Sequence, residues 1–193
     1  MEFNSAATIV GAEVVKWMTH NKELFPSGSA ATALTRSKIR LSSVTDDMSG
    51  CEAFVVSRWQ LKRLRRSQNE SHHIIVRPGL PVWYFEAVLA HELGHLYLDS
   101  LPGEVRLPNL LEEGFCQVLA YHYGLEHKHR HFALHAYHER FSGPYRHGFS
   151  FLKPVYDRGQ FQCGNGLRRV VQVLRDLKQT GRAASDGKKI LRS

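Results

Sequence analysis

The stretch His91-Glu92-Leu93-Gly94-His95 carries the pattern from which the rest of the chain is best understood. Residues four positions apart lie on the same face of an α-helix, so the imidazoles of His91 and His95 can reach one metal ion. Glu92 lies at the flank of that face, where its carboxylate can accept a proton from a metal-bound water without being a ligand itself. The pattern predicts a helix that supplies two metal ligands and a general base.

A third protein ligand is expected, because a catalytic zinc site holds its ion with three protein groups and one open water position. The candidates are Glu112 and Glu113, which lie near the start of a second stretch with helical spacing. The two carboxylates point about 100° apart on a helix, so only one of them can face the metal. Gln117 lies one turn beyond Glu113, where it is either a hydrogen-bond partner of a ligand histidine or a simple exposed glutamine.

The composition is that of an ordinary globular protein, and the 193 residues are enough for one domain with a buried core. No apolar run approaches the roughly 20 residues that cross a bilayer, and no basic segment precedes the mild apolar run from Ala6 to Val10. The three cysteines are an odd number without a CxxC pair, which argues against a disulfide framework. We therefore expect a single domain over residues 1–193, without a membrane span, in the reducing cytoplasm.

The chain is basic, with a formal net charge of +8 and twelve histidines. This charge gives some affinity for anionic surfaces, and a basic nucleic-acid-binding protein is one alternative function. No RNA-binding or zinc-finger pattern accompanies the charge, so a solvated basic surface is the favoured interpretation. The same interpretation is favoured for the basic residues within 58–66. Six histidines lie within residues 121–140, namely His122, His127, His129, His131, His135 and His138. The spacing of the last three allows a second metal site, but a histidine-rich surface is favoured for this stretch.

Hydrophobic periodicity predicts an α+β domain with a small twisted sheet, the metal helix and a glutamate helix, and the His-Glu-x-x-His motif makes a zincin-like fold the expectation. His73 to Arg77 gives the strongest strand signal, being short, β-branched and closed by Pro78-Gly79. In zincin folds an edge strand near the site pairs with the substrate backbone, and this strand is our candidate for that role. Helices are predicted over about 6–24, 81–99, 110–123 and 166–178, strands over about 39–44, 52–57 and 73–77, and a flexible tail from about 180.

The segment from Ser142 to Phe149 reads as a turn-rich loop. Peptide hydrolysis passes through a tetrahedral oxyanion, so a hydrogen-bond donor opposite the metal helps the reaction. Tyr145 and His147 are the two candidates for this donor, and a purely structural loop tyrosine is the alternative.

Three segments resemble the peptidase domain of the plant DA-one family, which are LIM-domain peptidases activated by ubiquitin. They are Gly79-Leu80-Pro81, Ala90 to His95 and Glu112 to Ala120, and the likeness continues in residues 145–149 and 166–169. It covers about residues 72–178, and the string Glu-Glu-Gly-x-Cys-Gln-Val-Leu-Ala is its most specific part.

The resemblance implies a zinc endopeptidase of the gluzincin type. It implies that His91, His95 and Glu113 bind Zn²⁺ and that Glu92 is the base. The glutamate directly before a glycine is the ligand in many gluzincins, which favours Glu113 over Glu112. Tyr145, as the candidate oxyanion donor, is the second predicted catalytic residue.

The chain lacks the LIM domain and the ubiquitin-interacting motifs of the plant members, so the expected form is a free-standing peptidase domain. The partners that the resemblance implies are protein or peptide substrates, including ubiquitin or ubiquitin-linked proteins. Two alternatives stay open, namely a catalytically inactive zinc-binding interaction module and the nucleic-acid-binding protein named above.

Overall fold

The computed structural model describes residues 3–21, 24, 38–41, 53–56, 73–76, 79–103, 105–127 and 143–180. The basic residues within 58–66, the histidines from 129 to 138 and the tail from 181 lie outside these residues. The described elements, in chain order, are α1 (Phe3–His20), β1 (Lys38–Leu41), β2 (Ala53–Val56), β3 (His73–Val76), α4 (Val82–Ser100), α5 (Asn109–Glu126), α7 (Pro144–Cys163) and α8 (Gly166–Thr180).

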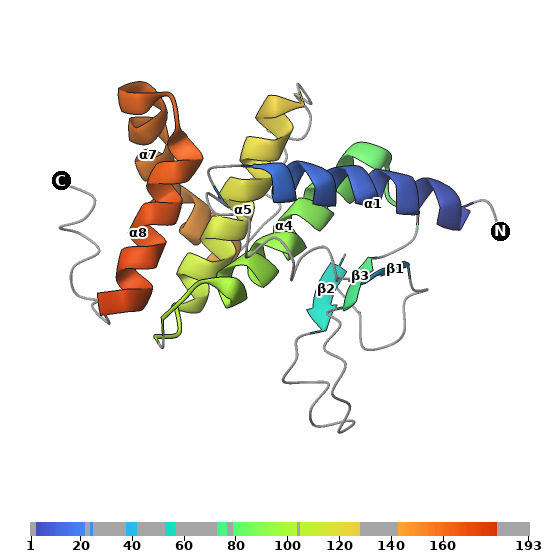
Figure 1. Ribbon diagram of the computed structural model, residues 1–193, viewed down its shortest axis with the longest axis horizontal. Coiled ribbons are helices and arrows are strands. Elements are labelled where there is room, and N and C mark those ends of the chain that lie inside the picture. Colours follow the sequence, from blue (N-terminus) through green and yellow to red (C-terminus); the bar gives the residue numbers. More distant parts are fainter. Residues whose placement is uncertain are drawn as a thin grey trace.

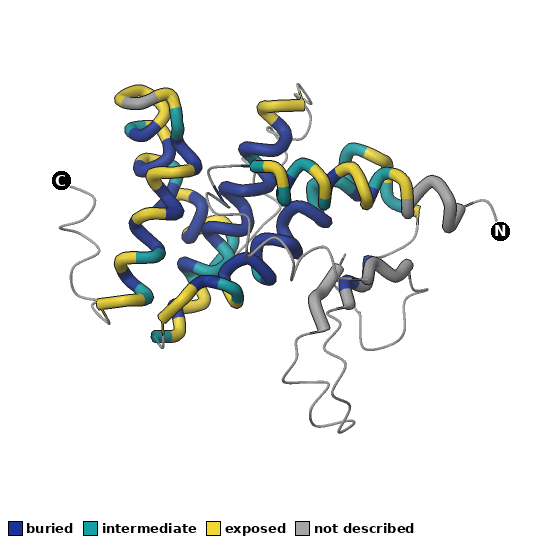
Figure 2. The backbone as a smooth tube through the Cα atoms, in the orientation of Figure 1, coloured by how far each residue is buried: buried dark blue, intermediate teal, exposed yellow. Residues whose placement is uncertain are grey.

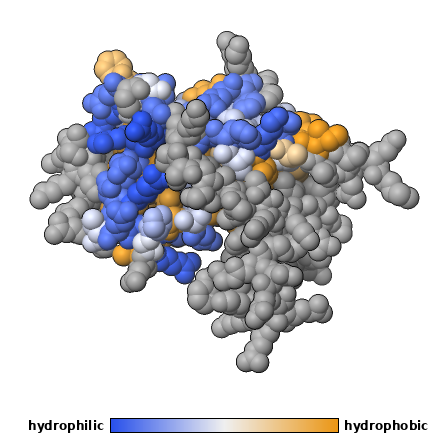
Figure 3. All heavy atoms as spheres, in the orientation of Figure 1, coloured by the Kyte–Doolittle hydropathy of each residue, from blue (hydrophilic) through white to orange (hydrophobic). Residues whose placement is uncertain are grey.

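Helix α5 lies at the centre of the arrangement, with α4 on one side and α7 on the other, and α8 packs on α7 (Figure 1). Helix α1 crosses α4. Buried residues run along α4 and α5, whereas exposed residues follow the outer sides of α7 and α8 (Figure 2). The outer face of α8 is correspondingly hydrophilic (Figure 3). The core is therefore built mainly from helix-to-helix contacts.

The prediction of an α+β fold with a twisted sheet is wrong, because the described body of the protein is helical. The five helices are 15 to 20 residues long, whereas each strand has four residues. Among the described side chains of the strands, Ile74 and Val76 join the core, and all the other core residues except Leu24, Leu101 and Leu107 belong to helices. Short β-branched runs indicated where strands form. They did not show that the core would be built from apolar faces of helices packed on one another, with only a small share from the sheet.

Strand β3 is the central strand of the small sheet, in the order β1-β3-β2. It pairs with β1 in parallel and with β2 in antiparallel, so both of its hydrogen-bonding edges are occupied. The hypothesis that this strand offers an open edge to a substrate is therefore wrong, because an added strand needs unpaired backbone groups.

The segment predicted as a loop over residues 142–149 is instead the beginning of α7, so that prediction is wrong. Pro144 stands in the first turn, where backbone amides have no hydrogen-bond partner within the helix, so the missing N–H of proline costs nothing. Its fixed φ also suits the helix. Gly143, with φ +67°, precedes the helix, and Gly164 ends it in the left-handed conformation. The glycine and proline taken as signs of a loop thus mark a helix boundary.

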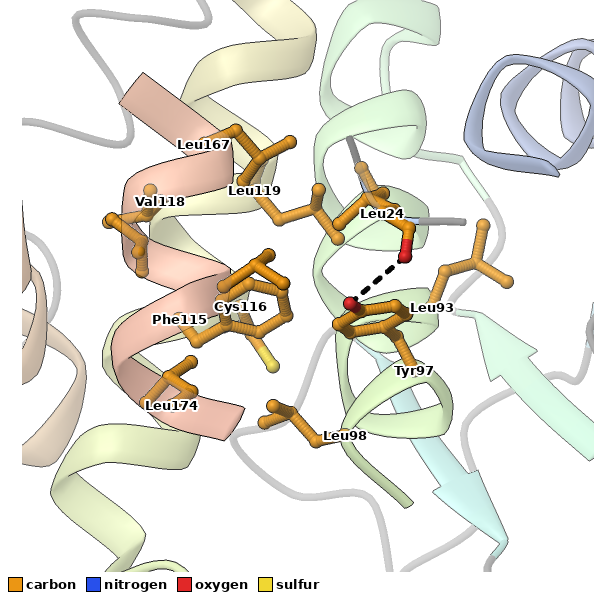
Figure 4. Packing of buried hydrophobic residues seen from close by; sticks show 14 of the residues in the cluster. Leu24, Leu93, Tyr97, Leu98, Phe115, Cys116, Val118, Leu119, Leu167 and Leu174 are labelled. Carbon is orange, nitrogen blue, oxygen red and sulfur yellow. Dashed lines mark hydrogen bonds between the residues drawn. The ribbon is translucent and has the colours of Figure 1, made fainter. Parts of the chain in front are cut away.

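The metal helix α4 is fixed at its far end by side chains from α8. Lys178 Nζ donates to the carbonyl oxygens of Leu98 at 2.8 Å and Leu101 at 3.1 Å, where the last turn of α4 has no basic residue of its own. The hydroxyl of Tyr97 donates a hydrogen bond to the carbonyl oxygen of Leu24 at 3.1 Å (Figure 4). Arg175 of α8 donates to that carbonyl oxygen and to the hydroxyl oxygen of Tyr97. These bonds hold α4 against the core.

Helices α5 and α7 touch through two glycines. A Cβ atom placed on Gly148 would lie 2.1 Å from the carbonyl oxygen of Leu110 and 2.7 Å from the Cα of Gly114. A Cβ placed on Gly114 would in turn lie 2.4 Å from the carbonyl carbon of Gly148. Because no side chain separates the two backbones, the first two turns of α7 lie against the first two turns of α5.

We expect Gly148→Ala to reduce the free energy of unfolding by about 1–3 kcal/mol or more, because overpacking forces the two helices apart. Chemical denaturation monitored by circular dichroism measures this change. Ser150→Ala, at an exposed position of the same helix, is the matched control and should stay within about 0.5 kcal/mol of the wild type. A Gly148→Ala variant as stable as this control would show that the close crossing of the helices is wrong.

Candidate metal centre

His91 and His95 of α4 meet Glu113 of α5 at one point. The Oε2 atom of Glu113 lies 3.1 Å from Nε2 of His91 and 3.6 Å from Nε2 of His95. The two imidazole rings stand edge to face, with their centroids 5.1 Å apart. Three groups that are the usual protein ligands of divalent transition ions therefore converge from two helices.

The centre is buried on one side and open on the other. His91 and Glu92 are buried, whereas the side chains of His95 and Glu113 keep 26% and 13% of their surface exposed. A catalytic metal site needs this combination, because the ion must be held firmly and still be reached by substrate and water.

Cys116 belongs to the same cluster and was not among the predicted site residues. One potential ligand atom from each of His91, His95 and Cys116 lies within 4.8 Å of the other two, which makes this group a possible metal-binding site. Cys116 stands three residues after Glu113, on the neighbouring part of the same helix face. The spacing from Glu113 could have pointed to Cys116 as a site residue, but spacing alone does not distinguish a cysteine of the core from one that faces a site.

The residues present fit a divalent ion in their chemistry. Imidazole nitrogen, carboxylate oxygen and thiolate sulfur are the donors that such ions take from proteins. Of the two ring nitrogens of His91, it is Nε2 that faces Glu113, whereas Nδ1 is buried without a hydrogen-bond partner among the described residues.

The charges of the cluster stabilise one another. Burial raises the pKa of Glu113, but hydrogen bonds from His91 and His95 outweigh it and lower the pKa to about 2. Burial lowers the pKa of His95, but the neighbouring Cys116, Glu113 and Glu92 outweigh it and raise this pKa to about 12. Without an ion, the centre at neutral pH therefore holds an anionic Glu113 against a cationic His95.

Glu113, rather than Glu112, makes the contacts with both histidines. Glu112 is half-buried, and burial raises its pKa against the opposing charges of Arg106 and His95. Gln117 is buried, so its interpretation as an exposed glutamine is wrong.

Tyr145 lies beside the cluster, with its ring centroid 5.7 Å from that of His91. It is half-buried in the first turn of α7, one turn before the glycine contact with α5. His147 is exposed, and two residues further along a helix a side chain points about 200° away. The structure therefore brings Tyr145 to the centre and turns His147 elsewhere.

A separate polar cluster occupies the other end of α5. His122 is buried there, with Nδ1 2.8 Å from the hydroxyl of Tyr156 and Nε2 3.2 Å from a carboxylate oxygen of Glu126. Trp17 of α1 donates its indole N–H to the same carboxylate group. The prediction of a histidine-rich surface is wrong for His122, whereas His127 is exposed and stacks on Tyr123 with centroids 4.0 Å apart.

A family model described as DA1-like, Protein DA1, matches residues 30–147 of the chain, a range that contains the whole cluster and Tyr145. The chain belongs to the DA1 family. Searches of the curated proteins and of the solved structures returned no match. The resemblance inferred from the sequence is thus confirmed, although this match begins and ends earlier along the chain than the expected range of about 72–178.

We expect the affinity of this DA1-family protein for a divalent ion, measured with zinc by chelator competition, to rise between pH 6 and pH 8. The raised pKa keeps His95 protonated throughout this range, whereas an ion needs the neutral imidazole, so binding must release a proton. The lowered pKa keeps Glu113 ionised throughout this range, so Glu113 does not contribute to the change of zinc affinity with pH. One released proton corresponds to about a tenfold gain per pH unit.

His147→Ala, which removes an exposed histidine outside the cluster, should leave that slope unchanged. An affinity that does not change with pH would contradict a protonated His95 in the ion-free centre.

Proposed function

We propose that this DA1-family protein is a zinc-dependent endopeptidase that hydrolyses peptide bonds in protein substrates. The observation that carries the proposal is the placement of one Glu113 oxygen within 3.1 and 3.6 Å of the Nε2 atoms of His91 and His95. Two imidazoles and one carboxylate are the ligand set of one class of catalytic zinc peptidase sites. Glu92, on the same helix as the histidines, supplies the base that such a site requires.

His91, His95 and Glu113 would hold the ion, which would supply Lewis acidity and lower the pKa of a bound water to about 7. Glu92 then accepts the proton of the attacking water through its carboxylate and passes it to the leaving amine. The burial of Glu92 shields this carboxylate from bulk solvent, which strengthens its interaction with the reacting groups. The protein residues thus supply the ligands, the orientation and the proton transfer.

Tyr145 is the donor that we assign to the oxyanion. Its ring stands beside that of His91, and from there its hydroxyl would donate a hydrogen bond to the negative oxygen that develops when water attacks a carbonyl. The glycine contact between α5 and α7 fixes this position, because it places the first turn of α7 next to Glu113.

The substrates in this proposal are proteins or peptides, with ubiquitin and ubiquitin-linked proteins as the first candidates because of the family. The site of action in this proposal is the cytoplasm, on the ground that the three cysteines are an odd number without a CxxC pair. In the described part of the chain, no helix has the length and apolar character to span a membrane.

The replacement Glu92→Gln tests the mechanism. The variant should still bind zinc, because Glu92 is not a ligand, but it should lose at least 10²-fold in cleavage rate because the base is gone. His95→Ala should lose both zinc binding and cleavage. Cleavage of denatured casein and of a mixture of ubiquitin conjugates, with and without chelator, provides the assay, and zinc content is measured on the same preparations.

His147→Ala, the exposed histidine of α7, is the control and should cleave like the wild type. Full activity in Glu92→Gln would refute the assignment of the base. A wild type that binds zinc and cleaves neither substrate would favour the inactive interaction module.

Tyr145→Phe removes the hydroxyl and keeps the ring. We expect kcat to fall by about 10²–10³-fold, the usual effect of removing one oxyanion donor, with zinc affinity and KM nearly unchanged. Steady-state kinetics on one peptide substrate separates these quantities. An unchanged kcat would assign Tyr145 a structural role.

A further inference from the structure

The thiol of Cys116 is fixed against the metal helix by a contact between two backbones. Cys116 is fully buried on α5, and a Cβ placed on Gly94 of α4 would lie 2.9 Å from its Sγ and 3.1 Å from its Cα. Only glycine at position 94 leaves room for this approach. Figure 4 shows Cys116 within the packed side chains between the two helices.

This sulfur is a hydrogen-bond partner of a candidate metal ligand. A ring nitrogen of His95, the residue directly after Gly94, lies within 4.8 Å of this sulfur, and a hydrogen bond joins the two side chains. His95 is the more exposed of the two histidines, with 26% of its side chain accessible compared with 10% for His91. Its ring is therefore held less by packing and depends more on polar contacts.

We infer that Cys116 is a positioning residue, whose buried sulfur hydrogen-bonds the imidazole of His95 and holds that ring in the orientation that binds the metal. This inference rests on the proposed zinc site. A histidine ligand commonly pairs its second nitrogen with a group behind it, and removing that group typically costs 10–100-fold in metal affinity.

Direct ligation by Cys116 is the competing interpretation, because its sulfur lies within 4.8 Å of a ring nitrogen of each histidine. Two features argue against it. The carboxylate of Glu113 already lies beside both Nε2 atoms. If the sulfur were added to His91, His95 and Glu113, the tetrahedral shell would be complete, and no position would remain for the water that hydrolysis needs.

The test compares Cys116→Ala with Cys116→Ser, and measures zinc affinity by chelator competition in the full chain. The alanine variant should bind zinc about 10–100-fold more weakly. The serine variant keeps a hydrogen-bonding group at this position and should recover most of that loss. An alanine variant with the affinity of the wild type would show that the sulfur only fills space, and would overturn the inference.

Cobalt(II) substitution separates positioning from ligation. A cobalt-bound thiolate gives a charge-transfer band in the near ultraviolet, so the wild type should lack this band if Cys116 only orients His95. A band that is present in the wild type and absent in Cys116→Ala would make the cysteine a ligand and overturn the inference.

Val118→Ala is the matched control, because it truncates another fully buried side chain of α5 two residues away. It should lose stability without losing zinc affinity, and thermal unfolding of all variants shows whether each one folds. If Cys116→Ala does not fold, Cys116→Ser and the cobalt spectrum of the wild type still decide the matter. A wild type that binds no zinc would refute the proposed function, whereas normal zinc binding with an unaffected Cys116→Ala would refute this inference alone.

Discussion

The close approach of α5 to the helices on both of its sides is the constraint on which the rest of the structure depends. On one side Gly94 of α4 lets the backbone of Cys116 come near, and on the other Gly148 of α7 meets Gly114. Each contact excludes even a methyl group. The first places Glu113 and Cys116 at the histidines of α4, and the second places Tyr145 beside them. The candidate centre is thus a consequence of how tightly three helices pack.

Without a bound ion, such a centre sets the cost of burying charged and polar groups against the gain from pairing them. The cluster gathers two carboxylates, two imidazoles and a thiol in a largely buried place, where each charge loses part of its hydration. For Glu113 the hydrogen bonds from both histidines outweigh this cost, whereas Nδ1 of His91 stays without a partner among the described residues. The bonds from Lys178 and Arg175 to α4 and its surroundings show how the surrounding helices hold the site in place.

The part of the site that was predicted from the sequence is the part with local geometry. The relation of His91 to His95 follows from helical spacing alone. The choice of Glu113 over Glu112 rested on the family resemblance, in which the ligand is the glutamate directly before a glycine. The structure gives that glycine a physical reason, because Gly114 is the contact with α7. Cys116 was missed because its role depends on a contact between helices.

The fold class was wrong for a similar reason. Strand signals over short β-branched runs do not reveal how much of the core the strands will build, and the described core is mostly helical. The start of α7 was read as a loop because Gly143 and Pro144 mark a boundary, and local sequence alone did not distinguish the start of a helix from a turn.

A crystal structure of the zinc-loaded protein, with anomalous scattering recorded at the zinc absorption edge, tests the central claim most directly. The account predicts one strong anomalous peak at the contact of α4 and α5, about 2.0–2.2 Å from Nε2 of His91, Nε2 of His95 and a carboxylate oxygen of Glu113, with a water at the fourth position. A peak whose ligands exclude Glu113, or no peak between these two helices, would contradict it.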